Sequence, residues 1–138
     1  MKTSKRILMF VLAAALLLFA CACSTGGGTK EEAVKAAVID YVKSGGDQIT
    51  DVKVTNVKIY SENDLDPEIV ASYDLGKDDI IFEVTFDVTV ADGVDANIMA
   101  IPDGEVDGQT VKGKNRVGVI RYADGKYTVD TKFFGTGF

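Results

Sequence analysis

The stretch "IIFEVTFDVTV", residues 80–90, decides the fold of this chain. Its apolar members alternate strictly with Glu, Thr and Asp, and they are Phe82, Val84, Phe86, Val88 and Val90. Successive side chains of a β-strand point to opposite faces. One apolar and one polar face is typical of an antiparallel strand that is covered on a single side. The stretch therefore predicts a central strand whose apolar face needs a cover.

The segment "TKEEAVKAAVIDYVKSGG", residues 29–46, supplies a helix for that cover. Thr29 and Glu32 have the spacing of a capping box. Five apolar residues recur at the spacing of one helix face: Val34, Ala37, Val38, Tyr41 and Val42. Gly45 and Gly46 are suited to a left-handed stop. We predict a helix over residues 30–44 with this stripe, Tyr41 included, in the core.

Two further segments extend the sheet. "ITDVKVTNVKIY", residues 49–60, alternates but changes phase, which predicts a bulge near Thr55 and Asn56. "GVIRYADGKYTVDTKFF", residues 118–134, predicts a hairpin about Asp124-Gly125, a pair favoured in two-residue turns. This turn sets three cross-strand pairs: Tyr122 with Tyr127, Ile120 with Val129, and Arg121 with Thr128.

The connecting segments give weaker signals. In "LDPEIVASYDLG", residues 65–76, Asp66 as N-cap, Pro67 at the first position and Gly76 as terminator predict a short helix, with a loop or irregular strand as the alternative. Residues 97–101 are expected to form a strand. Residues 102–115, rich in Gly and Asp, are expected to form a long turn or a hairpin tip.

The amino-terminal residues have the three parts of an export signal. Lys2, Lys5 and Arg6 precede an apolar run over residues 7–20, and small residues follow. The run is shorter than the about 20 apolar residues that a membrane span needs. We therefore expect residues 1–20 to be a signal peptide.

The two cysteines lie at the end of this signal. "LFAC", residues 18–21, resembles the lipobox of bacterial lipoproteins, which implies cleavage before Cys21 and a lipid on its thiol. Cys23 offers a competing frame, and plain secretion without a lipid is a further alternative. A zinc site would need more ligands than two cysteines in a chain without histidine. The resemblance implies acylation of Cys21 and a membrane anchor on the extracytoplasmic face.

Cleavage there would leave a strongly acidic chain. The whole sequence carries a net charge of −6, and residues 21–138, with 12 Lys+Arg against 21 Asp+Glu, carry −9. Such a surface repels nucleic acid, so no nucleic-acid partner is expected. Residues 21–29 form a tether that includes "STGGGT", and residues 30–138 have the length of one α+β domain.

The order of these elements resembles the nuclear transport factor 2-like, cystatin-like superfamily. The closing "VGVIRYADGKYTVDTKFFGTGF", residues 117–138, is similar to the last hairpin of small Gram-positive lipoproteins of uncharacterised function, including Gly135-Thr136-Gly137. Tyr127 stands where many of these relatives carry Trp. The resemblance implies an N-terminal helix packed on a curved antiparallel sheet to form a cone. It carries over no catalytic residues.

Aromatic residues of the last hairpin are the candidate ligand site. Tyr122 and Tyr127, with Phe133 and Phe134, could line the open end of such a cone. The alternative is that these cross-strand aromatics belong to the sheet core. The test is whether the concave face is filled with apolar side chains or holds a pocket of a few hundred Å³ with polar groups converging in it.

Acidic residues near position 105 imitate the start of a calcium loop. Asp103, Glu105 and Asp107 have the spacing of the first ligands of an EF-hand, but Lys114 stands where the bidentate Glu belongs. Acids also gather in turns because Asp favours them. We expect no metal and no cofactor.

The composition makes catalysis an unexpected role. The chain has no histidine, and both cysteines lie at the signal, so the common nucleophile–base pairs are lacking. The function we expect is a membrane-anchored binding or interaction module with a protein or small-molecule partner. The alternative is a small-molecule binder or minor enzyme that uses the interior of the cone.

Overall fold

The computed structural model describes residues 29–135 and confirms the α+β class. The main helix is α2 (Lys30–Lys43). The strands are β1 (Ile49–Tyr60), β2 (Ile80–Val90), β3 (Glu105–Asp107), β4 (Thr110–Ala123) and β5 (Lys126–Val129). Short helical segments are η1 (Glu62–Asp64), α3 (Pro67–Tyr73), α4 (Ala96–Met99) and η2 (Thr131–Phe133). The expected signal peptide, Cys21 and Cys23 lie outside the described residues.

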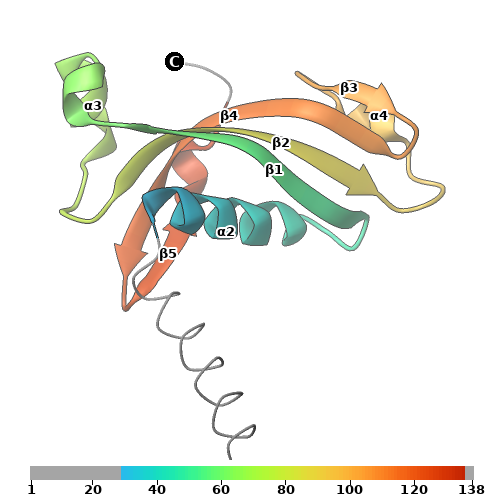
Figure 1. Ribbon diagram of the computed structural model, residues 1–138, viewed down its shortest axis with the longest axis horizontal. Helices are drawn as coiled ribbons and strands as arrows, with labels where there is room; N and C mark the ends of the chain where they lie inside the picture. The colour runs from blue at the N-terminus through green and yellow to red at the C-terminus, as the bar shows by residue number, and fades with distance from the viewer. Residues whose placement is uncertain (1–28, 136–138) are drawn as a thin grey trace, which may run out of the picture.

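The strands form one curved antiparallel sheet, and α2 lies across its concave side (Figure 1). The strand order is β1-β2-β4-β3, and β5 pairs with the C-terminal end of β4. β3 and β5 share one edge of β4 at different heights. Between Lys112, which pairs with β3, and Val117, which bridges Gly135, that edge of β4 has no strand beside it in the described part of the chain.

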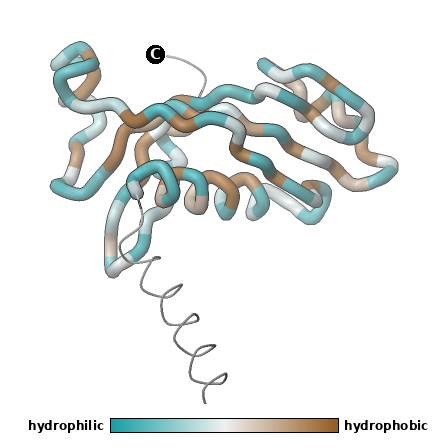
Figure 2. Tube along the Cα trace, in the orientation of Figure 1, coloured by the Kyte–Doolittle hydropathy of each residue, from teal (hydrophilic) through white to brown (hydrophobic). Residues whose placement is uncertain are grey.

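The alternation along β2 places the core where the sequence predicts it. Phe82, Phe86 and Val88 are fully buried on the concave face, together with Val34 and Val38 of α2. Apolar and polar residues alternate along the strands of the sheet (Figure 2). The helix and the sheet therefore bury each other's apolar faces, and this burial is the main stabilising term.

One arginine joins the α3 segment to the end of the sheet. Arg121 of β4 donates from Nη2 to the carbonyl of Tyr73 at 2.5 Å and from Nη1 to Asp79 at 2.9 Å. Its Nε donates to Asp130 at 2.8 Å. The ring of Tyr73 also packs edge-on against Phe133 of η2, with centroids 4.9 Å apart. These contacts fix α3 and η2 to β4.

Two local predictions are confirmed. The register of β1 against β2 shifts between Val54 and Asn56, so the predicted bulge is present. The hairpin pairs Tyr122 with Tyr127, Ile120 with Val129 and Arg121 with Thr128. Asp124 and Gly125 both adopt positive φ, 53° and 77°, as a two-residue turn of this type requires.

The predicted strand over residues 97–101 is wrong. Ala96–Met99 form α4 instead, because Asp95 caps it by accepting a hydrogen bond from the Asn97 amide at 3.0 Å. Residues 102–115 contain the hairpin tip that was one of the two expectations. Its second strand, β4, begins at Thr110, well before the hairpin segment at residue 118 that the sequence predicted.

The predicted helix ends also need correction. α2 ends at Lys43 with Ser44 as its C-cap, and of the two glycines expected to stop it only Gly46 has positive φ. α3 begins as predicted with Asp66 as N-cap and Pro67 at its start. It ends at Tyr73, and its C-cap Asp74 takes the left-handed conformation that was expected of Gly76. Across residues 29–135, no helix has the length and hydrophobicity that crossing a membrane requires.

Candidate functional site

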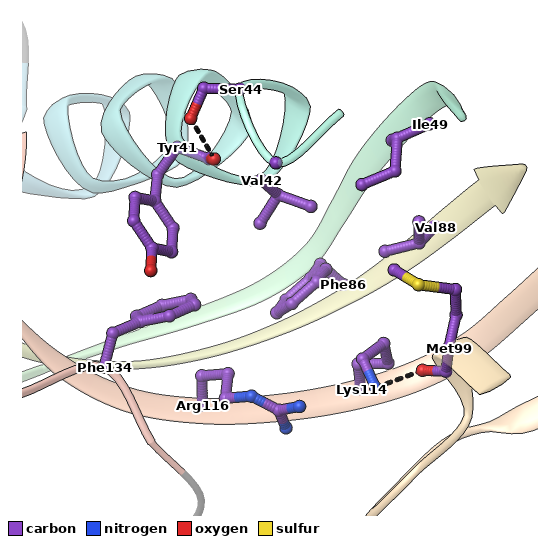
Figure 3. Close-up of a pocket in the computed structure, with 11 residues that line it drawn as sticks. Tyr41, Val42, Ser44, Ile49, Phe86, Val88, Met99, Lys114, Arg116 and Phe134 are labelled. Carbon is purple, nitrogen blue, oxygen red and sulfur yellow. Dashed lines mark hydrogen bonds between the residues drawn. The ribbon is translucent and has the colours of Figure 1, made fainter. Parts of the chain in front are cut away.

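A cavity of about 300 Å³ opens on the concave face of the sheet. It lies between the C-terminal end of α2, the start of β1, the end of α4, and the strands β2 and β4 (Figure 3). Val34 and Val38 of α2 are fully buried, whereas Tyr41 and Val42, one turn later, are only half-buried and line the cavity. The apolar stripe of α2 thus extends past the filled part of the core into an open space.

The larger part of the cavity wall is apolar. Val42 of α2 and Ile49 of β1 form one side, and Phe86 and Val88 of β2 form the floor (Figure 3). Phe134 closes one end, where its ring contacts Tyr41 edge-on at 5.0 Å between centroids. A concave, mostly apolar wall with a few polar groups is typical of small-molecule sites.

Two cations of β4 supply the polar part of the wall. Lys114 pairs with Phe86 and Arg116 pairs with Val84, so both cations lie on the concave face. Residues two apart on a strand share a face, which brings the ammonium and the guanidinium side by side in the cavity (Figure 3). Their side chains are 7% and 13% exposed.

The carboxylate of Asp103 contacts both of these cations. Its Oδ1 accepts from Arg116 Nη1 at 2.5 Å and lies 3.5 Å from Lys114 Nζ, and its Oδ2 accepts from the Asn115 amide. Burial alone would raise the pKa of Asp103, but the Asn115 amide and the Arg116 guanidinium lower it below its usual value. Asp103 is therefore ionised near neutral pH. It lies at the edge of β4 that β3 and β5 leave unpaired among the described residues.

Lys114 is almost saturated with hydrogen bonds. Its Nζ donates to the carbonyl of Met99 at 2.5 Å and to that of Asp103 at 3.1 Å. Burial and the neighbouring Arg116 lower the pKa of Lys114, and Asp103 only partly offsets them. The ammonium thus acts on the cavity mainly through its charge.

Arg116 and Tyr41 keep donors for a bound molecule. The bonds of Arg116 to Asp103 and to the carbonyl of Asn115 both come from Nη1. Within residues 29–135, no fully buried side-chain nitrogen or oxygen lacks a hydrogen bond. The Nε and Nη2 atoms of Arg116 and the hydroxyl of Tyr41 are therefore reached by solvent rather than sealed in the interior.

The structure places the tyrosines predicted to bind a ligand elsewhere. Tyr122 and Tyr127 pair across the β4–β5 hairpin with ring centroids 4.8 Å apart, and Tyr122 is 44% exposed. Neither residue lines the cavity. Of the other aromatics in that prediction, Phe134 lines the cavity and Phe133 contacts Tyr73.

The acidic residues with calcium-loop spacing do not form one site, because each of them has different contacts. Asp103 binds the two cations of β4, Glu105 is exposed on β3, and Asp107 pairs with Lys112 at 2.5 Å. Among the described residues, no group of three His, Cys, Asp or Glu side chains is placed to hold a metal ion.

The sequence interpretation missed Lys114 because it placed this residue in a turn or hairpin tip, and it missed Arg116 because it assigned this residue to no element. Their signal was present as two cations at strand spacing in an acidic chain, next to "VGVI". No family model, no curated protein and no solved structure matches this chain.

Proposed function

We propose that this chain is a lipid-anchored lipoprotein of the extracytoplasmic membrane face whose domain binds a small molecule in the concave cavity. The observation that carries the binding role is the cavity itself, with Tyr41, Lys114 and Arg116 converging in a mostly apolar wall. Its volume of about 300 Å³ lies at the lower end of the range of about 300–1,000 Å³ usual for ligand pockets.

The proposed fold is the nuclear transport factor 2-like, cystatin-like cone. The support for it is a helix on the concave side of a curved antiparallel sheet (Figure 1). In such a cone the open end would be the region beyond Val42, where α2 ends and the cavity begins. Tyr122 and Tyr127 would then lie away from the opening.

The proposed anchor is a lipid on Cys21. The support for it is the sequence alone: a basic head, an apolar run and "LFAC". Two acyl chains hold a protein stably to a bilayer where one does so only marginally. Cells that express the full chain should incorporate labelled fatty acid into it, and Cys21→Ala should abolish the label. Retention of label in Cys21→Ala with loss in Cys23→Ala would move the attachment to Cys23.

The binding role is tested with a neutral probe and a variant that fills the cavity. 3-Phenylpropanamide should bind the full-length chain, as measured by titration calorimetry or ligand-observed NMR. Val42→Phe adds a ring to the cavity wall and should weaken binding at least about tenfold, since the volume is small. Ala36→Phe adds the same ring at an exposed position of α2 and should leave binding unchanged. Equal binding by all three proteins would contradict the site.

A protein-interaction module is the second candidate, and one surface favours it. Ile98 and Ile101, near α4, are 68% and 75% exposed. Exposed apolar residues that lie together are typical of contact surfaces. If this role holds, replacing both residues with Ser should release a partner captured from the native envelope, whereas Val42→Phe should not.

A further inference from the structure

We infer that the cavity binds a monocarboxylate with a small apolar body and that Arg116 receives its carboxylate. This inference rests on the proposed binding role and adds the chemical class of the ligand. It depends on three features of the cavity: its charge, the free donors of Arg116, and the apolar wall opposite them.

The charge of the cluster is unbalanced. Lys114 and Arg116 have nearly buried side chains, and the carboxylate bonded to them is that of Asp103. Buried charges are stable when they are paired. Two cations and one anion leave an excess of one positive charge, and among the described residues none that lines the cavity is Asp or Glu. An anion with a single negative charge would complete the balance.

The hydrogen-bonding geometry fits a carboxylate. Asp103 and a backbone carbonyl occupy Nη1 of Arg116, which leaves Nε and Nη2 unbonded to the described residues. A guanidinium binds a carboxylate through two parallel N–H···O bonds, and this fork is the strong form of the contact. Lys114 has its donors engaged by two carbonyls, so it contributes charge at close range.

The remaining wall fits an apolar body. Val42 and Ile49 line the side of the cavity opposite the cations, and Phe86 and Phe134 line the space between (Figure 3). The solvent-reached hydroxyl of Tyr41 adds one hydrogen bond near the Phe134 end. A ligand that places its carboxylate on Arg116 would thus lay an alkyl or aryl group between α2 and β2.

The test compares an acid with its neutral isostere on the purified full-length chain. 3-Phenylpropionate should bind at least about tenfold more tightly than 3-phenylpropanamide by titration calorimetry at pH 7, because a charged hydrogen-bond pair is replaced by a neutral one. This ratio of the two affinities is measured on the wild-type chain alone. Equal affinities would overturn the carboxylate class and leave the binding role intact, whereas no binding of either compound would overturn both.

Variants then assign the ratio of the two affinities to the cation pair of the cavity, Lys114 and Arg116. Arg116→Gln should reduce the acid-to-amide ratio to near one while the amide still binds. Lys112→Gln removes the same charge from an exposed position of the same strand and should leave the ratio unchanged. If Arg116→Gln fails to fold, Lys114→Met takes its place and should lower the ratio as well. A ratio unaffected by the variant that folds would overturn the assignment.

Two further ligands test the charge of the bound anion and the kind of molecule that supplies the carboxylate. Phenyl phosphate, a dianion near neutral pH, should bind more weakly than 3-phenylpropionate, and tighter binding would overturn the single-charge argument. N-acetyl-Ala-Phe tested as the free acid represents a peptide C-terminus. Tighter binding of this peptide than of 3-phenylpropionate would assign the carboxylate to a peptide end, and weaker binding would assign it to a free acid; both results support the class.

Discussion

Asp103 Oδ1 accepts a hydrogen bond from Arg116 Nη1 at 2.5 Å, at an edge of β4 where no strand of residues 29–135 lies alongside. The same carboxylate lies 3.5 Å from Lys114 Nζ. One side chain from the segment before β3 therefore closes the sheet edge and holds two cations on the concave face. This makes the cation pair part of the fold as well as part of the cavity.

Asp103→Asn should affect stability and binding in opposite directions. Loss of the carboxylate leaves two nearly buried cations unpaired, and we expect the free energy of unfolding to fall by about 1–3 kcal/mol. The same loss raises the net positive charge beside Arg116, so 3-phenylpropionate should bind more tightly. Urea denaturation and calorimetry measure the two effects. Asp107→Asn, which breaks an exposed pair with Lys112, is the control and should change little.

Gly118→Ala should destabilise the closing segment of the chain. A Cβ at Gly118 would lie 2.9 Å from Phe82 Cζ and 3.0 Å from the Phe133 carbonyl oxygen, so the crossing of residues 133–135 over β4 would have to shift. We expect a loss of about 1–3 kcal/mol in the free energy of unfolding, as overpacking causes. A Cβ at Gly135 would meet no atom of the other described residues within 4 Å, so Gly135→Ala should be near neutral. Equal effects of the two substitutions would contradict the packing described here.

Acid should destabilise the ion-pair cluster that Arg121 forms with Asp79 and Asp130. The hydrogen bond from Arg121 lowers the pKa of Asp130. Burial alone would raise the pKa of Asp79, but the amides of Tyr122 and Gly76 and the Arg121 guanidinium lower it. A carboxyl with a lowered folded-state pKa stabilises the fold above its ordinary value of 3.8, and that stability is lost as the pH falls through the folded-state pKa.

The urea midpoint should therefore be level from neutral pH down to about pH 5 and fall below about pH 4. Asp79→Asn should lower the urea midpoint at pH 7 and make its fall below about pH 4 smaller. Asp78→Asn, which removes an exposed carboxylate one residue away, should leave the fall of the urea midpoint in acid unchanged. A midpoint that rises on acidification would be incompatible with these ion pairs.

Tyr60 should ionise later than an ordinary tyrosine. Its hydroxyl donates to Glu83 Oε2 at 2.5 Å, and this bond, with burial and the Glu83 charge, raises the pKa of Tyr60 to about 12. The tyrosinate absorbance of the wild-type chain minus that of Tyr60→Phe gives this titration directly. Glu83→Gln should move the midpoint back toward 10. A midpoint unmoved by Glu83→Gln would show that the hydrogen bond is not the cause.

The elements with strict patterns were predictable from the sequence. β2 alternates through five apolar residues, α2 carries a helical stripe, and Asp124-Gly125 defines the turn and the pairing of its hairpin. Each of these signals is local, because the period or the turn type is set by neighbouring residues. The bulge in β1 was readable for the same reason, as a change of phase near Asn56.

The candidate site was not predictable, because it depends on distant residues. Lys114 and Arg116 interrupt the alternation of β4, and only the register against Phe86 and Val84 shows that they face the concave side. Asp103 has the spacing of a calcium-loop residue, yet it reaches Arg116 at an edge of β4 that is left without a strand within residues 29–135. Position in the sheet, rather than residue type, decided these roles.

The amide chemical shifts of the labelled full-length chain, recorded during titration with 3-phenylpropionate, test the central claim most directly. We predict saturable shifts at residues that line the cavity, such as Ser44, Gly45 and Lys114, and none at Tyr122 or Tyr127. Shifts confined to the β4–β5 hairpin, or no saturable shifts, would contradict a ligand site on the concave face.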